Sequence, residues 1–285
     1  MDPKVKAYRQ SEVLEEWGAE AERSSFEGVV EYLNRIVYQQ TKHPRWAIIR
    51  SLSHAGHVSS LNIFRENLPS HDSQVQRYAA TGLGRTGDVT DVFRLKHYLR
   101  LQEYIILRAR VAQALGWLGY NECVEPLFEC HIDPNLVVRK AAAKALARVC
   151  NVVDSVEERL LLASQSDDID LKRFAAKTMG YIVKESCVSR LVELVWEHNP
   201  RVYRVAAQGL ERIVNRGVSL YWPVSLRENV ALAIIAYWAK TSNYYDETML
   251  NRFTYKRTTI SHLTGRKQKS IKAVGVRAII KKVRG

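Results

Sequence analysis

Apolar residues recur through the middle of the chain at intervals of three and four, which is the pattern of an amphipathic helix. The clearest example, VQRYAATGLGRTG, starts at Val75 and places its first, fifth and ninth residues on one side of a helix. Four further segments share this pattern, and they start at Leu107, Val138, Leu171 and Val202. The sequence therefore predicts five related helices whose starts are 32, 31, 33 and 31 residues apart.

The aligned segments also share small residues. The sixth position is alanine in all five segments, and the eighth is Gly, Ala or Thr. Small side chains let a second helix approach closely, so we expect each helix to be buried on one side. A weaker sixth copy precedes the others, with Ile48, Ile49, Leu52 and Gly56 in the corresponding places.

Second amphipathic segments, such as DVTDVFRLKHYL and CVSRLVELVW, lie between the repeated helices. Each return to a repeated helix contains residues whose side chains accept hydrogen bonds from the free amides of a helix start. These turns are Asp72-Ser73, Asp133-Pro134-Asn135, Asp167-Asp168 and Asn199-Pro200. Each repeat is therefore predicted to be a pair of helices.

This organisation resembles the HEAT-like repeat family, in its short-repeat form that also occurs in bilin lyases. The segment DPNLVVRKAAAKALA at 133–147 carries the likeness best. The resemblance implies an all-α solenoid of about five to six HEAT-like helix pairs with helical caps, and it implies no function by itself. We expect an N-terminal cap at 1–42, HEAT-like repeats at 43–215, a C-terminal helical cap at 216–264 and a basic segment at 265–285.

The stretch GLGRTG at 82–87 has the spacing of a dinucleotide-binding loop. Such a loop works only where its glycines follow a strand and open a helix. Here Gly84 recurs as Gly116 and Gly180, and Gly87 recurs as Gly119. We therefore interpret these glycines as residues that close the last turn of a helix.

No motif for catalysis is present in the sequence. It has no nucleophile elbow, Walker loop, H-E-x-x-H or paired His/Cys ligand set. His54 and His57 have no Cys, Asp or Glu partner nearby in sequence that would complete a metal site. We therefore expect a nonenzymatic protein with no metal and no small-molecule cofactor.

The third, seventh and eleventh positions of the five helices lie on one side, away from the buried stripe. Of these fifteen residues nine are cationic, two are aromatic and none is acidic, whereas solvated faces usually mix both signs. The candidate nucleic-acid-binding residues on this face are Arg77, Arg85, Trp117, Lys140, Lys144, Arg148, Arg173, Lys177, Tyr181, Arg204 and Arg212.

In similar proteins these helices line a concave surface, so the resemblance implies a basic groove. It also implies that the acids of the intervening segments face outward, and these acids are Asp91, Glu125, Glu129, Glu157, Glu158 and Glu193. A groove of positive charge attracts a phosphodiester backbone and releases its counterions. Its two aromatic residues could stack on bases or sugars.

A structural explanation is open for the cations near the helix starts. In HEAT-like repeats a basic residue there often pairs with an Asp of the neighbouring turn. By this likeness Asp72, Asp133 or Asp168 could pair with Arg77, Arg139, Lys140, Arg173 and Arg204. The likeness does not account for the cations further along each helix, which are Arg85, Lys144, Arg148, Lys177 and Arg212.

The net charge of +13 is concentrated at the C-terminus. From Arg252 to Gly285 there are eleven Lys or Arg and no Asp or Glu. A basic tail of this kind is typical of an arm that contacts nucleic acid, and the aliphatic residues between 271 and 280 indicate that it docks. The candidate residues in the tail are Lys256, Arg257, Arg266, Lys267, Lys269, Lys272, Arg277, Lys281, Lys282 and Arg284.

These features predict a nonenzymatic solenoid that binds DNA or RNA as a subunit of a larger nucleoprotein complex with protein partners. One alternative is an adaptor for an acidic protein. Another is a HEAT-like alkylpurine DNA glycosylase, for which the groove offers Trp117 and Tyr181 but no acid. The N-terminus has no secretory signal, and the longest apolar run, 230–239, is about half of a bilayer span. We expect an intracellular protein without a membrane segment, in the cytoplasm, nucleoid or nucleus.

Overall fold

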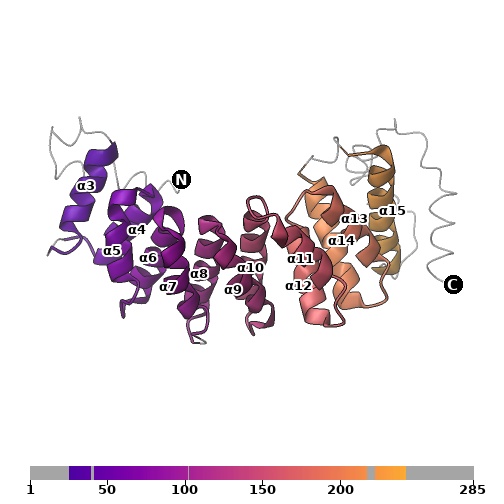
Figure 1. Cartoon of the computed structure of the whole chain (residues 1–285), viewed down its shortest axis with the longest axis horizontal. Helices are drawn as coiled ribbons and strands as arrows, with labels where there is room; N and C mark the ends of the chain where they lie inside the picture. The colour runs from indigo at the N-terminus through magenta and orange to yellow at the C-terminus, as the bar shows by residue number, and fades with distance from the viewer. Residues whose placement is uncertain (1–25, 40–41, 102, 217–221, 242–285) are drawn as a thin grey trace. The chain divides into compact units, whose positions relative to one another are not determined.

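The computed structural model describes residues 26–39, 42–101, 103–216 and 222–241. Within these ranges the chain forms thirteen α-helices, α3 to α15, together with three short 3-10 helices and no strand (Figure 1). The all-α prediction is therefore confirmed. The chain divides into two compact units, Met1–Val153 and Asp154–Gly285.

In the first unit the repeated segments form one layer of helices, which we call B helices. They are α4 (Arg45–Ala55), α6 (Ser73–Thr86), α8 (Ile105–Leu118) and α10 (Leu136–Val149), and each packs against the next. The intervening helices, which we call A helices, are α3 (Phe26–Ile36), α5 (Leu61–Asn67), α7 (Val89–Tyr98) and α9 (Val124–Glu129). Each A helix packs against the B helix that follows it, so the unit is a stack of helix pairs.

The second unit repeats this arrangement. Its B helices are α12 (Ile169–Met179) and α14 (Pro200–Val214), which pack against each other. Its A helices are α11 (Ser155–Ala163), α13 (Glu185–Val195) and α15 (Val224–Thr241).

The core of each unit is the apolar stripe predicted from the repeat. In α6, α8, α10, α12 and α14 the fifth, sixth and ninth positions are fully buried. The predicted turn residues start the helices as expected, because the side chains of Asp72, Asn135, Asp168 and Asn199 accept hydrogen bonds from backbone amides of the first turn. The weak sixth copy is confirmed as α4, whose Ile48, Ile49 and Leu52 are buried against α6.

Two of the repeated glycines have a different role from the one predicted, whereas Gly87 and Gly180 end α6 and α12 as predicted. Gly84 and Gly116 lie inside helices, where a Cβ on Gly84 would be 2.6 Å from the Cα of Ala114 and one on Gly116 would be 2.5 Å from the Cβ of Ala145. They are therefore needed because neighbouring B helices approach closely. Gly119 does close a helix as predicted, since it ends α8 in the left-handed region with a φ of 71°.

Several predicted elements lie outside the described residues. They include residues 1–25 of the predicted N-terminal cap, residues 242–264 of the predicted C-terminal cap and the basic segment 265–285. The predicted boundaries at 42, 215 and 264 stay predictions.

Candidate nucleic-acid interface

The most accessible part of the predicted basic face is on α10. Lys140, Lys144 and Arg148 follow one another at every fourth residue and are all exposed, so they form a row along one side of this helix. Arg85 and Arg204 are also exposed. The remaining candidates on the B helices are half-buried, and they are Arg77, Trp117, Arg173, Lys177, Tyr181 and Arg212.

The eleventh-position residues of the first unit contact one another across neighbouring B helices. The guanidinium carbons of Arg85 and Arg148 lie 5.1 and 5.5 Å from the centroid of the Trp117 ring. Because α8 packs between α6 and α10, the two guanidinium groups reach the ring from opposite neighbours. Both distances are within the range of a cation–π interaction.

Arg85 is fixed further by the end of the preceding B helix. Its Nη1 donates hydrogen bonds to the carbonyl oxygens of Ser53 and His54 at 3.1 and 3.0 Å. These carbonyls belong to the last turn of α4, where a helix leaves its acceptors without an internal partner and where positive charge is favourable. The arginine is therefore held by two carbonyls and one ring.

The second unit has the same arrangement at its eleventh positions. Arg212 of α14 donates from Nη1 to the carbonyl oxygen of Gly180 at 3.1 Å, and its guanidinium carbon lies 4.4 Å from the Tyr181 ring centroid. Arg216 donates to the carbonyl oxygen of Tyr181 at 3.2 Å. Among the described residues, none of Arg85, Arg148 and Arg212 forms an ion pair with a carboxylate.

The Asp carboxylates that the likeness offered as partners are not the groups that Arg77, Arg139 and Arg173 contact. Arg77 donates to the carbonyl oxygen of Ser73 at 3.1 Å, and Arg173 pairs with Asp170 on its own helix at 2.8 Å. Arg139 donates to the carbonyl oxygens of Asp133 and Pro134. Lys140 and Arg204 are exposed to solvent. The carboxylate of Asp72 serves instead as the cap of α6.

In the ion pairs that link α8 and α12 to the turn before the next repeated helix, the basic residue occupies the second position of the repeat. Arg108 donates to the Asp133 carboxylate at 2.9 and 3.1 Å, and the two side chains are only 3% and 9% exposed. Lys172 and Glu197 form the corresponding pair of the second unit at 3.3 Å. The sequence signal for these ion pairs was a basic residue at the second position of three segments, and these residues are Arg108, Arg139 and Lys172.

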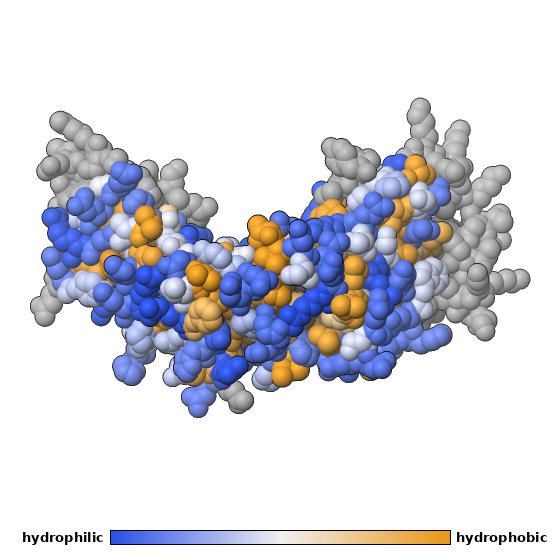
Figure 2. Space-filling model, in the orientation of Figure 1, coloured by the Kyte–Doolittle hydropathy of each residue, from blue (hydrophilic) through white to orange (hydrophobic). Residues whose placement is uncertain are grey.

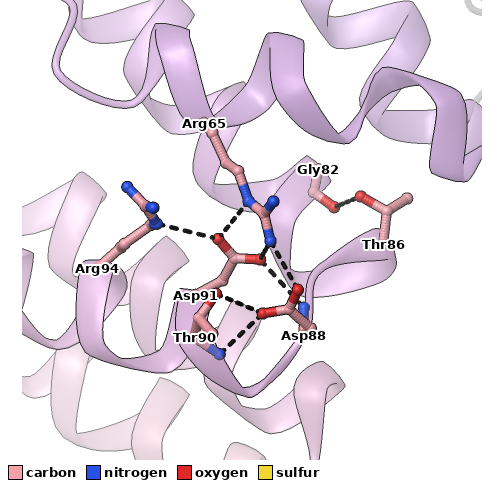
Figure 3. Close-up of polar contacts among 7 residues, drawn as sticks. All are labelled: Arg65, Gly82, Thr86, Asp88, Thr90, Asp91 and Arg94. Carbon is pink, nitrogen blue, oxygen red and sulfur yellow. Dashed lines mark hydrogen bonds and ion pairs between the residues drawn. The ribbon is translucent and has the colours of Figure 1, made fainter.

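The A helices α5 and α7 are joined by a second polar cluster (Figure 3). Arg65 of α5 donates to both oxygens of the Asp91 carboxylate, each at 2.9 Å, and to Asp88 at 2.7 Å. Hydrogen bonds from the Thr90 hydroxyl and amide, together with Arg65, lower the pKa of Asp88 to about 2. Asp91 is completely buried, so the prediction that this acid faces outward is wrong.

The helix α4 adds residues to the face that were not among the candidates. Its third, seventh and eleventh positions are Trp46, Arg50 and His54. The Trp46 and Tyr78 rings stack with centroids 6.4 Å apart, and the guanidinium carbon of Arg50 lies 5.8 Å from the Tyr78 centroid. The weak sixth copy of the repeat was the signal for this extension.

This arrangement is suited to binding anions. Guanidinium groups present a planar set of donors that matches phosphate geometry, and the arginines of the eleventh position are positioned without a carboxylate that would neutralise them. The ten tail candidates, from Lys256 to Arg284, lie outside the described residues. No three His, Cys, Asp or Glu side chains of the described ranges come together as a metal site.

The comparison with protein families agrees with this fold. Residues 94–164, which extend from within α7 to the end of α11, match the family model of HEAT repeats. Within this range the chain forms HEAT-like helix pairs, and the other described helices are paired in the same way. None of the described helices has the length and apolar character needed to cross a bilayer.

Solved structures are similar to this chain at low sequence identity. The CpcE and CpcF complex of phycocyanin lyase from Nostoc is 17% identical, with 83% of this chain and 95% of that chain covered and a TM-score of 0.42. The Escherichia coli protein YibA is 15% identical over 92% and 97% of the two chains, with a TM-score of 0.41. Human deoxyhypusine hydroxylase is 15% identical over 91% and 96%, with a TM-score of 0.31. No curated protein sequence matches the chain.

Proposed function

We propose that this protein is a nonenzymatic HEAT-like scaffold that binds nucleic acid through the cationic face of its B helices. The observation that carries the proposal is the charge of that face, where nine of fifteen positions are cationic and none is acidic. The exposed row of Lys140, Lys144 and Arg148 is its most accessible part. Phosphates bound there release condensed counterions, which supplies most of the affinity of such a site.

The dependence of affinity on salt tests this proposal. If the five face cations of the first unit contact phosphates of a duplex, the logarithm of the association constant falls with the logarithm of salt concentration with a slope of about −4.5. Fluorescence anisotropy of a labelled duplex, titrated with the full chain between about 50 and 200 mM salt, gives this slope. A variant that ends at Thr264 reports the contribution of the basic segment. A slope near zero, or no binding at low salt, would contradict the proposal.

A second role, as an adaptor for a protein partner, is favoured by exposed apolar side chains of the first unit. They lie at the starts of α8 and α10, which pack side by side, and they are Tyr104, Ile105, Ile106, Ile132, Leu136 and Val137. Figure 2 shows apolar residues scattered between hydrophilic ones on the visible face. Exposed apolar clusters mark protein interaction sites. A partner that stays bound after nuclease treatment supports this role, and one that is released is held by nucleic acid.

A further inference from the structure

The aromatic rings on the B-helix face are covered by other side chains. Trp117 lies between the guanidinium groups of Arg85 and Arg148, whose carbons are 5.1 and 5.5 Å from its centroid. In the second unit Arg212 lies 4.4 Å from the centroid of Tyr181. The rings of α4 and α6 follow the same rule, because Tyr78 is stacked by Trp46 and approached by Arg50. Trp117 is therefore covered from both neighbouring helices, and Tyr78 and Tyr181 are each covered from one.

The covered face of each ring opposes the usual way of holding a single strand. Proteins that bind unpaired strands stack successive bases on free aromatic faces, and each stacked base contributes about 1–3 kcal/mol. A base that stacked on Trp117 would have to displace a guanidinium group from the ring. On this face the aromatic rings hold the arginine side chains in position.

The arginines are held in fixed positions by these contacts. Within the described part of the chain, Arg85 makes its two hydrogen bonds through Nη1, to the carbonyl oxygens of Ser53 and His54, so the donors on Nε and Nη2 remain there for another acceptor. Arg212 likewise uses Nη1 for the carbonyl of Gly180. Because the side-chain entropy is already lost before binding, a rigid ligand gains the most from such an array.

We propose that this face binds the phosphate backbone of a double-stranded nucleic acid and reads neither base identity nor unpaired bases. The inference rests on the proposed function and specifies its ligand class. A duplex presents phosphates at fixed intervals and at high linear charge density. DNA and RNA duplexes share this chemistry.

The direct test compares three labelled ligands of about 20 nucleotides, a DNA duplex, an RNA duplex and an unpaired oligo-dT strand, by anisotropy with the full chain. We expect at least one duplex to bind about tenfold more tightly than the strand at equal salt. Duplexes of shuffled sequence are expected to agree within about threefold, because a base-reading site discriminates more strongly. A strand that binds as tightly as both duplexes overturns the inference.

The variant Trp117→Leu separates the two roles of the ring. If the ring only positions Arg85 and Arg148, its loss weakens duplex and strand by the same factor, and Trp117→Phe restores both because it keeps a flat ring. If the ring stacks on a base, the strand alone loses about 10- to 100-fold, and this result overturns the inference while the proposed function survives. Absence of binding to all three ligands contradicts the proposed function itself.

Discussion

The variant Arg108→Leu is expected to lower the free energy of unfolding of the first unit by about 4 kcal/mol. Arg108 donates two hydrogen bonds to the Asp133 carboxylate and one, at 2.9 Å, to the carbonyl oxygen of Leu101. Both members of the ion pair are nearly inaccessible to solvent. Loss of the arginine leaves a buried carboxylate without its counter-charge, which costs more than an exposed pair contributes. Urea unfolding followed by circular dichroism measures the change.

Two variants control for this interpretation. Arg100 pairs with Glu129 at 3.7 Å, but its side chain is 78% exposed, so Arg100→Leu is expected to cost less than about 1 kcal/mol. The double variant Arg108→Leu/Asp133→Asn removes both charges and keeps an acceptor for the amide of Asn135. It is expected to be more stable than Arg108→Leu alone. Equal stabilities of Arg108→Leu and the unmodified protein would show that the pair does not fasten α8 to the turn before α10.

The triple reversal Lys140→Glu/Lys144→Glu/Arg148→Glu is expected to weaken duplex binding by at least about 100-fold near 100 mM salt. Each change removes a cation from the exposed row on α10 and adds a charge that repels phosphate. The slope of log affinity against log salt should become less steep by about 3, which is about one per lost contact. Anisotropy titration at several salt concentrations measures both quantities.

The matched control places the same three reversals in the A layer of the first unit. Arg35 and Lys96 lie on α3 and α7, Arg100 follows α7, and all three are exposed. The variant Arg35→Glu/Lys96→Glu/Arg100→Glu changes the net charge equally but leaves the B-helix face intact. We expect it to reduce affinity by less than about fivefold, through the long-range field alone. Similar losses in the two variants would show that net charge, and not this face, binds the ligand.

The fold was predictable from the sequence because the patterns that determine it lie within each helix and the turn before it. Fully buried positions such as Ala80 and Leu83 recur in every B helix at helical spacing, and cap residues such as Asp72 precede them in each turn. The role of Gly84 was not predictable in this way, since only the neighbouring helix shows that its Cα faces Ala114 across a distance too short for a side chain. In the sequence, a glycine that ends a helix cannot be distinguished from a glycine against which a neighbouring helix packs.

The sequence predicted the positive charge of the candidate site but not the contacts between its side chains. The basic face follows from residues spaced by four, such as Lys140 and Lys144. The contact of Arg85 with Trp117 joins residues 32 positions apart, and the pair of Arg65 with Asp91 joins residues 26 apart. Both depend on the register between neighbouring helices, which the periodicity of one helix does not contain. For this reason Asp91, a charged residue in an amphipathic segment, was expected at the surface and is buried.

The reactivity of single lysines shows directly whether the B-helix face binds the duplex. The full chain is acetylated at limiting reagent, alone and with a saturating duplex, and each lysine is quantified by mass spectrometry. We expect Lys140 and Lys144 of α10 to lose most of their reactivity when the duplex is bound, while Lys96 on the A helix α7 reacts as before. Unchanged reactivity of Lys140 and Lys144 in a complex that has formed, or protection of Lys96 in their place, would contradict this expectation.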